Sequence, residues 1–240
     1  MLTTDALPSL PVFEIPVHLH GDYPQWLTNR ICAGEGTHVV TLNAEIAMMT
    51  QRDPAIATVI KQADLVIPDG AGVVFYLKLK GKNQARFPGI ELAEAMLARA
   101  AKNHWQVVFF GGAPGVADKA KDKWLRHYPQ LHITTQHGYL TPETEQAWQI
   151  TLQDLQPQLI FTCLGVPKQE FWIRHHRHLC PHSTWLGLGG SFDVWSGLKQ
   201  RAPKLWQQLH LEWLYRLLQE PSRWRRMLAI PQFVWRSLWS

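Results

Sequence analysis

The sequence predicts an α/β fold in which a mostly parallel sheet carries helices on both faces, and three observations support this class. Short apolar runs, rich in β-branched and aromatic residues, alternate along the chain with amphipathic helical patterns. The runs are apolar along most of their length, as expected of strands that are covered on both faces. With 240 residues, of which 46% are hydrophobic and 18% charged, the chain can bury one such core.

The predicted elements alternate between strand and helix along the chain. Residues 1–16 contain three prolines and little periodicity, so we interpret them as an irregular lead-in. The strand-like runs are residues 37–42, 65–67, 106–110, 132–135, 159–164 and 184–188. The helical patterns are residues 44–50, 72–79, 116–127 and 169–179. This order is typical of a Rossmann-like domain, which we assign to residues 17–198.

A basic, tryptophan-rich segment follows at residues 199–240. It holds eight Lys and Arg residues against two acids, a net charge of +6, whereas the whole chain carries +5. Five of the twelve tryptophans also lie there, and indole rings between arginines suit a membrane interface. The alternative is a helix that packs its tryptophans on the body and leaves its arginines in water. We predict a helical appendage that meets an anionic surface or a phosphate.

Composition also indicates the cellular compartment. The chain has no run of about 18 apolar residues and no basic segment followed by an apolar run at its start, so we expect neither an integral membrane protein nor a secreted one. Three scattered cysteines suit a reducing compartment, and the cytoplasm is the expectation. The histidines of residues 175–182 do not have the spacing of a zinc site, so we expect no metal.

Polar side chains follow the first two predicted strands. Asp69 stands between an apolar strand and a glycine, where a carboxylate can act as the general base that takes a proton from a hydroxyl. The alternative is an N-cap of the next helix. Thr41 and Asn43 point to the same face at a strand end, where they can bind a sugar or a phosphate. Asn43 can also cap the helix that follows it.

Two glycine-containing loops follow later strands. The loop of residues 111–115, which includes Gly112, is similar to a turn in which backbone N–H groups approach a diphosphate. It lacks the full dinucleotide spacing and the later acid, so NAD is disfavoured while a nucleotide diphosphate stays open. In the loop of residues 165–170, Lys168 and Gln169 start a helix and can meet a phosphate or a sugar. The alternative there is a solvated first turn, in which Glu170 favours the helix dipole.

Six segments in order resemble the WecG/TagA/CpsF family of bacterial glycosyltransferases. They are residues 41–45, 63–70, 86–92, 137–139, 164–170 and 189–226, and the resemblance extends from about residue 17 to about residue 226. It implies a cytoplasmic enzyme, peripheral on the inner face of the plasma membrane, in cell-envelope or exopolysaccharide synthesis. It also implies transfer of an N-acetylhexosamine, similar to N-acetylmannosamine, from a UDP-sugar to a polyprenyl-diphosphate-linked sugar. Inversion at the anomeric carbon and no cofactor or metal are further implications.

The resemblance also assigns roles to residues by position. Asp69 is the implied catalytic base, with Thr41 and Asn43 beside it in the sugar pocket. Arg86 and Gln169 are the implied ligands of donor or acceptor groups. Tyr139 and Asp193 are implied to contact the nucleotide, together with Gly112 of the glycine loop. The appendage arginines, which are implied to close over the site and neutralise the diphosphate, are Arg216, Arg223 and Arg226.

This chain departs from the family pattern next to Arg86. The family usually has an aspartate where this chain has Glu91, and an acid where it has Ala85. We therefore expect a change in donor or acceptor preference. A homo-oligomer stays open, and no nucleic acid partner is expected.

Two other functions compete with the glycosyltransferase. One is another nucleotide-sugar enzyme, such as an epimerase or dehydrogenase, which would carry a bound dinucleotide. The other is a non-enzymatic scaffold that binds membranes through the appendage, in which mutation of Asp69 would have no effect.

Overall fold

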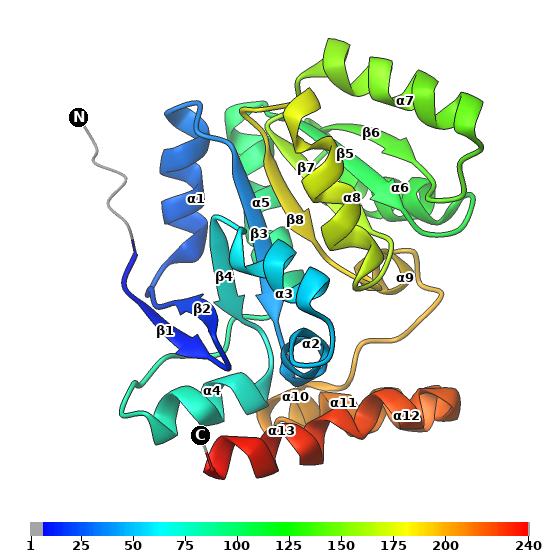
Figure 1. Cartoon of the computed structure of the whole chain (residues 1–240). Helices are drawn as coiled ribbons and strands as arrows, with labels where there is room; N and C mark the ends of the chain where they lie inside the picture. Colours follow the sequence, from blue (N-terminus) through cyan, green and yellow to red (C-terminus); the bar gives the residue numbers. More distant parts are fainter. Residues whose placement is uncertain (1–6, 240) are drawn as a thin grey trace.

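A six-stranded parallel sheet forms the centre of the molecule (Figure 1). The computed structural model describes residues 7–239. The strands are β3 (Thr37–Leu42), β4 (Leu65–Pro68), β5 (Gln106–Gly111), β6 (His132–Gln136), β7 (Leu159–Cys163) and β8 (Thr184–Gly187). They lie side by side in the order β4-β3-β8-β7-β5-β6, and every neighbouring pair is parallel. The predicted fold class is confirmed, and all carboxyl ends of the strands share one edge.

Helices connect the strands and cover both faces of the sheet. They are α1 (Tyr23–Cys32), α2 (Ala44–Thr50), α3 (Pro54–Lys61), α4 (Ala71–Leu79), α5 (Gly89–Asn103), α6 (Val116–His127), α7 (Pro142–Leu155), α8 (Lys168–His176) and α9 (Ser191–Trp195). The structure adds α1, α3, α5, α7 and α9 to the helices expected from the pattern. It also ends α8 earlier, in a 3-10 turn at Arg177–Leu179.

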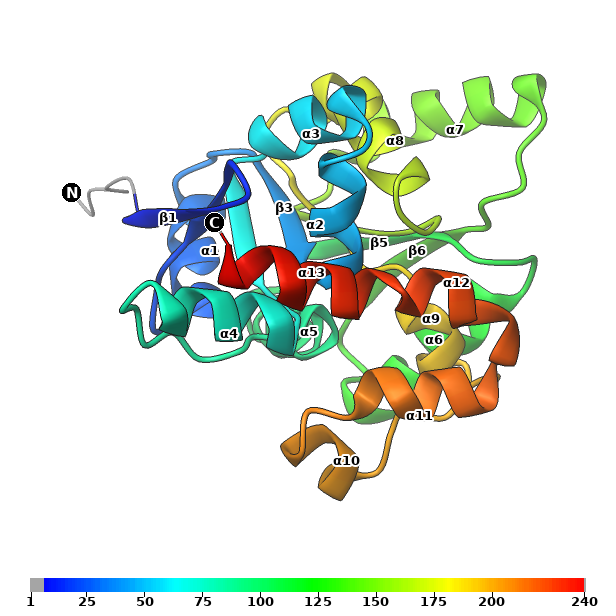
Figure 2. The ribbon, with the colours of Figure 1, turned by 60° about the horizontal axis from the view of Figure 1, so that its bottom comes forward.

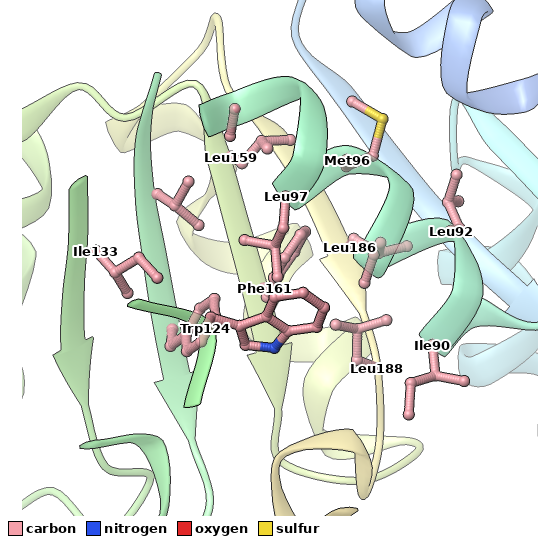
Figure 3. Packing of buried hydrophobic residues seen from close by; sticks show 14 of the residues in the cluster. Ile90, Leu92, Met96, Leu97, Trp124, Ile133, Leu159, Phe161, Leu186 and Leu188 are labelled. Carbon is pink, nitrogen blue, oxygen red and sulfur yellow. The ribbon is translucent and has the colours of Figure 1, made fainter. Parts of the chain in front are cut away.

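Alternate strand residues point into two separate cores. On one face, Phe109 and Phe161 pack under α5 and α6, and Figure 3 shows Leu97 and Trp124 beside Phe161. On the other face, Phe110 packs with side chains of α7 and α8. The rings of Phe109, Phe110 and Phe161 are fully buried because the strands are covered on both sides. Burial on both faces explains the nearly continuous apolar runs and fixes the shared edge at which the strands end.

The interpretation of residues 1–16 as irregular is wrong for its second half. An antiparallel hairpin of β1 (Ser9–Val12) and β2 (Ile15–His18) lies there, and the proposed boundary at residue 17 would divide its second strand. Phe13 and Glu14 form the turn with φ of 48° and 71°, as two-residue hairpins require. The prolines are compatible with this hairpin because edge strands tolerate residues without an N–H. It packs its fully buried Val12, Ile15 and Val17 into the core.

The appendage consists of short helices that cross the carboxyl edge of the sheet. They are α10 (Lys204–Gln208), α11 (Glu212–Gln219), a 3-10 turn (Pro221–Arg223), α12 (Trp224–Met227) and α13 (Ala229–Leu238), and Figure 2 shows them passing across this side of the molecule. The last helix packs on α2 and α4. Its Phe233 is fully buried, with its ring centroid 5.0 Å from that of Phe13. The end of the chain is therefore part of the core and holds the appendage over the strand ends.

Candidate active site

Two connected chambers lie between the strand ends and the appendage. The larger has a volume of about 640 Å³ and the smaller about 360 Å³. Asp69 lines both chambers, together with Asn43 and three arginines of the appendage. Ten of the eleven predicted site residues line the larger chamber: Thr41, Asn43, Asp69, Gly112, Tyr139, Gln169, Asp193, Arg216, Arg223 and Arg226. The eleventh, Arg86, lines the smaller one.

Asp69 is held by the start of α5, not by the start of α4. Its Oδ1 accepts a hydrogen bond from the backbone N–H of Gly89 at 3.3 Å, whereas α4 begins at Gly70 without a side-chain cap. The alternative role as a cap of α4 is therefore wrong. Burial raises the pKa of Asp69 to about 6, against the opposing effects of Arg216 and Arg86. Such a carboxylate is ionised at neutral pH and still has the proton affinity that suits a general base.

Thr41 and Asn43 shape the wall beside Asp69. The Oδ1 of Asn43 accepts the N–H of Ile46 at 3.0 Å, so the predicted cap of α2 is confirmed. Thr41 packs on Gly89, where an added Cβ would lie 2.6 Å from the Thr41 Cγ2. Only glycine fits there, and its absent side chain brings α5 close enough for Gly89 to reach Asp69.

The glycine loop after β5 forms a tight corner of the larger chamber. Gly111 has a φ of 118°, and a Cβ on it would lie 2.4 Å from the carbonyl oxygen of Cys163. The N–H of Gly112 donates to that same oxygen at 2.9 Å. This N–H is therefore engaged by β7 and is not directed at a ligand. Tyr139 lies at the rim of the same chamber with a side chain that is 72% exposed.

A buried polar chain extends beneath the larger chamber. Gln169 donates from Nε2 to Oε1 of Glu170 at 2.9 Å and accepts the N–H of Gly189 through its Oε1, also at 2.9 Å. The second oxygen of Glu170 contacts Nε2 of His38 at 2.9 Å, with both side chains only 2% exposed. Gln169 is thus bonded inside the protein, and it positions the loop that starts at Gly189.

His38 and Glu170 were not singled out as a pair by sequence reasoning. The two residues are 132 positions apart, and the packing of α8 against β3 brings them together. One signal was present, because His38 carries the one ionisable side chain in the strand Thr37–Leu42. Gly187 has no room for a Cβ, which would lie 2.5 Å from Nε2 of Gln169.

Most cations around the chambers are paired with carboxylates. Arg226 bonds Glu45 at 2.5 Å. Arg223 bonds Glu220, which in turn bonds Lys199 at 2.7 Å. These two partners lower the pKa of Glu220 to about 2. The paired cations are therefore fixed in place over the chambers.

Asp193 and Arg86 have fixed partners in the same way. Asp193 bonds Lys199 at 3.0 Å, so the predicted nucleotide contact and a lysine that the sequence did not single out lie together. Arg86 bonds Glu212 at 2.7 Å. Glu91, the departure from the family pattern, bonds Arg201 at 2.5 Å. It therefore contributes to holding the appendage.

Arg216 differs from these cations. Within residues 7–239, no carboxylate oxygen lies within 4 Å of its guanidinium group, while its charge acts on Asp69. Arg216 is therefore free to meet an anion that enters beside this carboxylate.

In the described part of the chain, no group of three or more His, Cys, Asp or Glu side chains is placed to hold a metal ion. No helix between residues 7 and 239 combines the length and the apolar character that a transmembrane span requires.

Comparison with known proteins decides between the competing functions. The glycosyl transferase WecG/TagA/CpsF family matches residues 10–240, which includes the hairpin and α13, beyond the limits expected from the six segments. The chain therefore belongs to this family. It is a glycosyltransferase, and the family match does not favour the dehydrogenase or the scaffold.

Two curated relatives carry the same description, "N-acetylglucosaminyldiphosphoundecaprenol N-acetyl-beta-D-mannosaminyltransferase". The protein of Bacillus spizizenii is 40% identical over 209 residues, which is 86% of this chain and 80% of the relative. That of Bacillus subtilis is 36% identical over 201 residues, or 83% of this chain and 78% of the relative.

Proposed function

We propose that this glycosyltransferase moves an N-acetylhexosamine, N-acetylmannosamine in particular, from a UDP-sugar to a sugar on polyprenyl diphosphate. The descriptions of the two relatives support the acceptor and the sugar. The position of Asp69 carries the proposal, because its carboxylate lines both chambers and has a pKa of about 6. A base at this junction can contact an acceptor in one chamber and a donor in the other.

In the proposed reaction, an acceptor hydroxyl attacks the anomeric carbon while Asp69 takes its proton. The new carbon–oxygen bond forms as the bond to the UDP oxygen breaks, and the electron pair leaves with UDP. A single displacement of this kind inverts the anomeric carbon. The larger chamber, which the loops after β5, β7 and β8 surround, is the proposed seat of the UDP-sugar.

The arginines supply the charge that the departing diphosphate requires. Arg216, Arg223 and Arg226 line both chambers, and guanidinium groups bind phosphate oxygens with two hydrogen bonds. Among the described residues, Arg216 has no carboxylate partner to give up before it binds, which makes it the first of the three to meet the diphosphate. Charge stabilisation by fixed donors can replace a metal ion in such a step. We therefore propose a metal-independent reaction.

The basic appendage suits an enzyme on the inner face of the plasma membrane. Its exposed Trp224, Trp235 and Trp239 lie among arginines, a composition that favours anionic lipid headgroups. A lipid-linked acceptor embedded in that membrane would then be within reach of the chambers.

A donor screen tests the proposal. The protein is incubated with UDP-activated N-acetylmannosamine, N-acetylglucosamine or N-acetylgalactosamine and a short-chain N-acetylglucosaminyl-diphosphate lipid, with and without EDTA. We expect one donor to be used, with the product inverted by NMR and the rate unchanged by EDTA. A product with retained configuration, or a rate lost in EDTA and restored by Mg²⁺, would contradict the mechanism. Transfer from none of these donors would contradict the proposed function.

A further inference from the structure

The smaller chamber has one charged end and one apolar end. The charged side chains that line it are Arg86, Arg216, Arg223 and Arg226, together with the carboxylates Glu45, Asp69 and Glu212. Apolar side chains of α4, α11, α12 and α13 line the rest: Phe75, Trp213, Met227, Ile230, Phe233 and Val234. Figure 2 shows α13 lying beside α4, and these two helices are in contact. The chamber thus combines a charged part that contains arginines with an apolar part formed by these helices.

The apolar end is built before any ligand enters. Phe233 is fully buried, and its ring packs against those of Phe13 and Tyr76. Phe75 and Val234, in contrast, are 41% and 37% exposed. Large apolar side chains that remain exposed beside a rigid floor commonly mark a site for an apolar ligand.

The placement of charged and apolar side chains in the smaller chamber limits which ligand can bind there. The ligand must carry an anionic group at the arginines and an apolar chain directly attached to it. A nucleotide diphosphate lacks the chain, and a free fatty acid or a headgroup phosphate does not place a sugar at Asp69. A prenyl chain attached to a diphosphate, with a sugar on its other side, fits the whole sequence from α13 to Asp69.

We propose that this chamber binds the first isoprene units of the acceptor lipid, with the sugar at Asp69. Because Arg216, Arg223 and Arg226 line both chambers, the lipid diphosphate meets them from the smaller chamber and the UDP diphosphate from the larger one. The inference rests on the proposed function, because that function supplies the diphosphate-linked acceptor. The remainder of the prenyl chain stays in the membrane.

Paired acceptors and paired variants test this site. The two acceptors share one N-acetylglucosaminyl diphosphate and carry either a farnesyl or a butyl tail, and KM is measured for each. Phe75→Ser and Val234→Asn remove apolar side chains from the chamber. Leu79→Ser and Leu238→Asn are matched controls one helical turn further along the same two helices. All four side chains are exposed, so the fold should tolerate each change.

We expect the two chamber variants to raise KM for the farnesyl acceptor about tenfold, the size of effect of lost apolar contacts in a pocket. KM for the butyl acceptor should stay within about twofold of wild type, and the control variants should leave both values unchanged. An equal rise for both acceptors, or an equal effect of the controls, would overturn the inference while the proposed function stands. If the wild-type protein uses neither acceptor, the proposed function fails and the inference fails with it.

A binding measurement tests the isoprene site without depending on turnover. Calorimetry compares farnesyl diphosphate with inorganic diphosphate on the wild-type protein and on Phe75→Ser. Because burial of each methylene favours binding, farnesyl diphosphate should bind at least about tenfold more tightly to the wild type. The advantage should shrink in the variant. Equal affinity of the wild-type protein for the two compounds would exclude an isoprene site.

Discussion

The buried carboxylate of Asp69 lowers the stability of the folded protein when it is ionised, as expected of a residue kept for catalysis and not for structure. Its pKa in the folded protein is about 6, above the ordinary value of 3.8. The folded state therefore binds the proton more tightly than the unfolded chain does. Above pH 6 the ionised, desolvated carboxylate lowers the free energy of unfolding by up to about 3 kcal/mol. Below pH 4 both states are protonated and this effect disappears.

The variant Asp69→Asn should accordingly be more stable than the wild type at high pH. The neutral amide retains the shape without the buried charge, so we expect a melting temperature several degrees higher at pH 8. The difference should close as the pH falls towards 4. Scanning calorimetry at both values checks this. A lower melting temperature at pH 8 is what loss of a helix cap would give, and it would contradict the account.

Several residues that line the larger chamber could be predicted from the sequence because of a simple topological rule. Parallel strands end at one edge, so polar residues after each predicted strand gather there, as Thr41, Asp69 and Gly112 do. The partners of these residues could not be found in this way. Glu170 meets His38, and Glu220 meets Lys199, only after distant elements have packed. Sequence spacing carries no information on such pairs.

At the scale of elements, the His38–Glu170 pair joins β3 to α8 under the active site. Gln169, which is bonded to Glu170, also accepts the N–H of Gly189, the second residue of the loop after β8. Removing one partner of a buried, hydrogen-bonded pair leaves the other without compensation and commonly costs about 3–5 kcal/mol. This loop lines the larger chamber, so the pair couples the stability of the sheet to the shape of the proposed donor site.

We therefore expect Glu170→Ala to lower the melting temperature and to raise KM for the donor more than it lowers kcat. Glu170→Gln, which still accepts a hydrogen bond, should recover part of both losses. The exposed Asp122→Ala on α6 is the control and should change neither quantity. Steady-state kinetics with varied donor, together with thermal unfolding, measures these effects. Wild-type donor KM in a folded Glu170→Ala protein would show that the pair does not shape the donor site.

Element boundaries were predictable to different degrees for physical reasons. The buried strands have a strong apolar signal, and β3 begins and ends at the predicted residues. The hairpin was missed because its prolines usually mark loops, although edge strands tolerate them. The packing of α13 was missed because Phe233 lies in a segment rich in exposed tryptophan and arginine, and only its contacts with Phe13 and Tyr76 distinguish it.

At the scale of the whole molecule, the appendage has features of both alternatives that composition alone left open. Its α13 packs into the core through Phe233, while Trp235 and Trp239 remain 67% and 77% exposed. The charge of residues 199–240 is +6, although many of these cations are paired. Truncation of α13 would therefore open the core as well as remove the exposed tryptophans.

Point variants are the sharper test of membrane association. The wild-type protein should bind vesicles that contain phosphatidylglycerol, and added salt should weaken this binding. The double variant Trp235→Ala, Trp239→Ala should reduce it several-fold. Ile150→Ala on α7 is an exposed apolar control on a helix far from α13 (Figure 1). Sedimentation with vesicles measures the fraction of each protein that is bound. An equal loss in the control, or none in the double variant, would count against a membrane role for these tryptophans.

The central claim is that Asp69 is the general base of the transfer reaction, and Asp69→Asn tests it most directly. Turnover and donor affinity are measured on the same preparation, with the butyl acceptor so that membrane binding has no influence. The account predicts that kcat falls by about 10²–10⁴-fold while the Kd of the UDP-sugar stays near the wild-type value. A variant that retains more than about a third of wild-type turnover would contradict it.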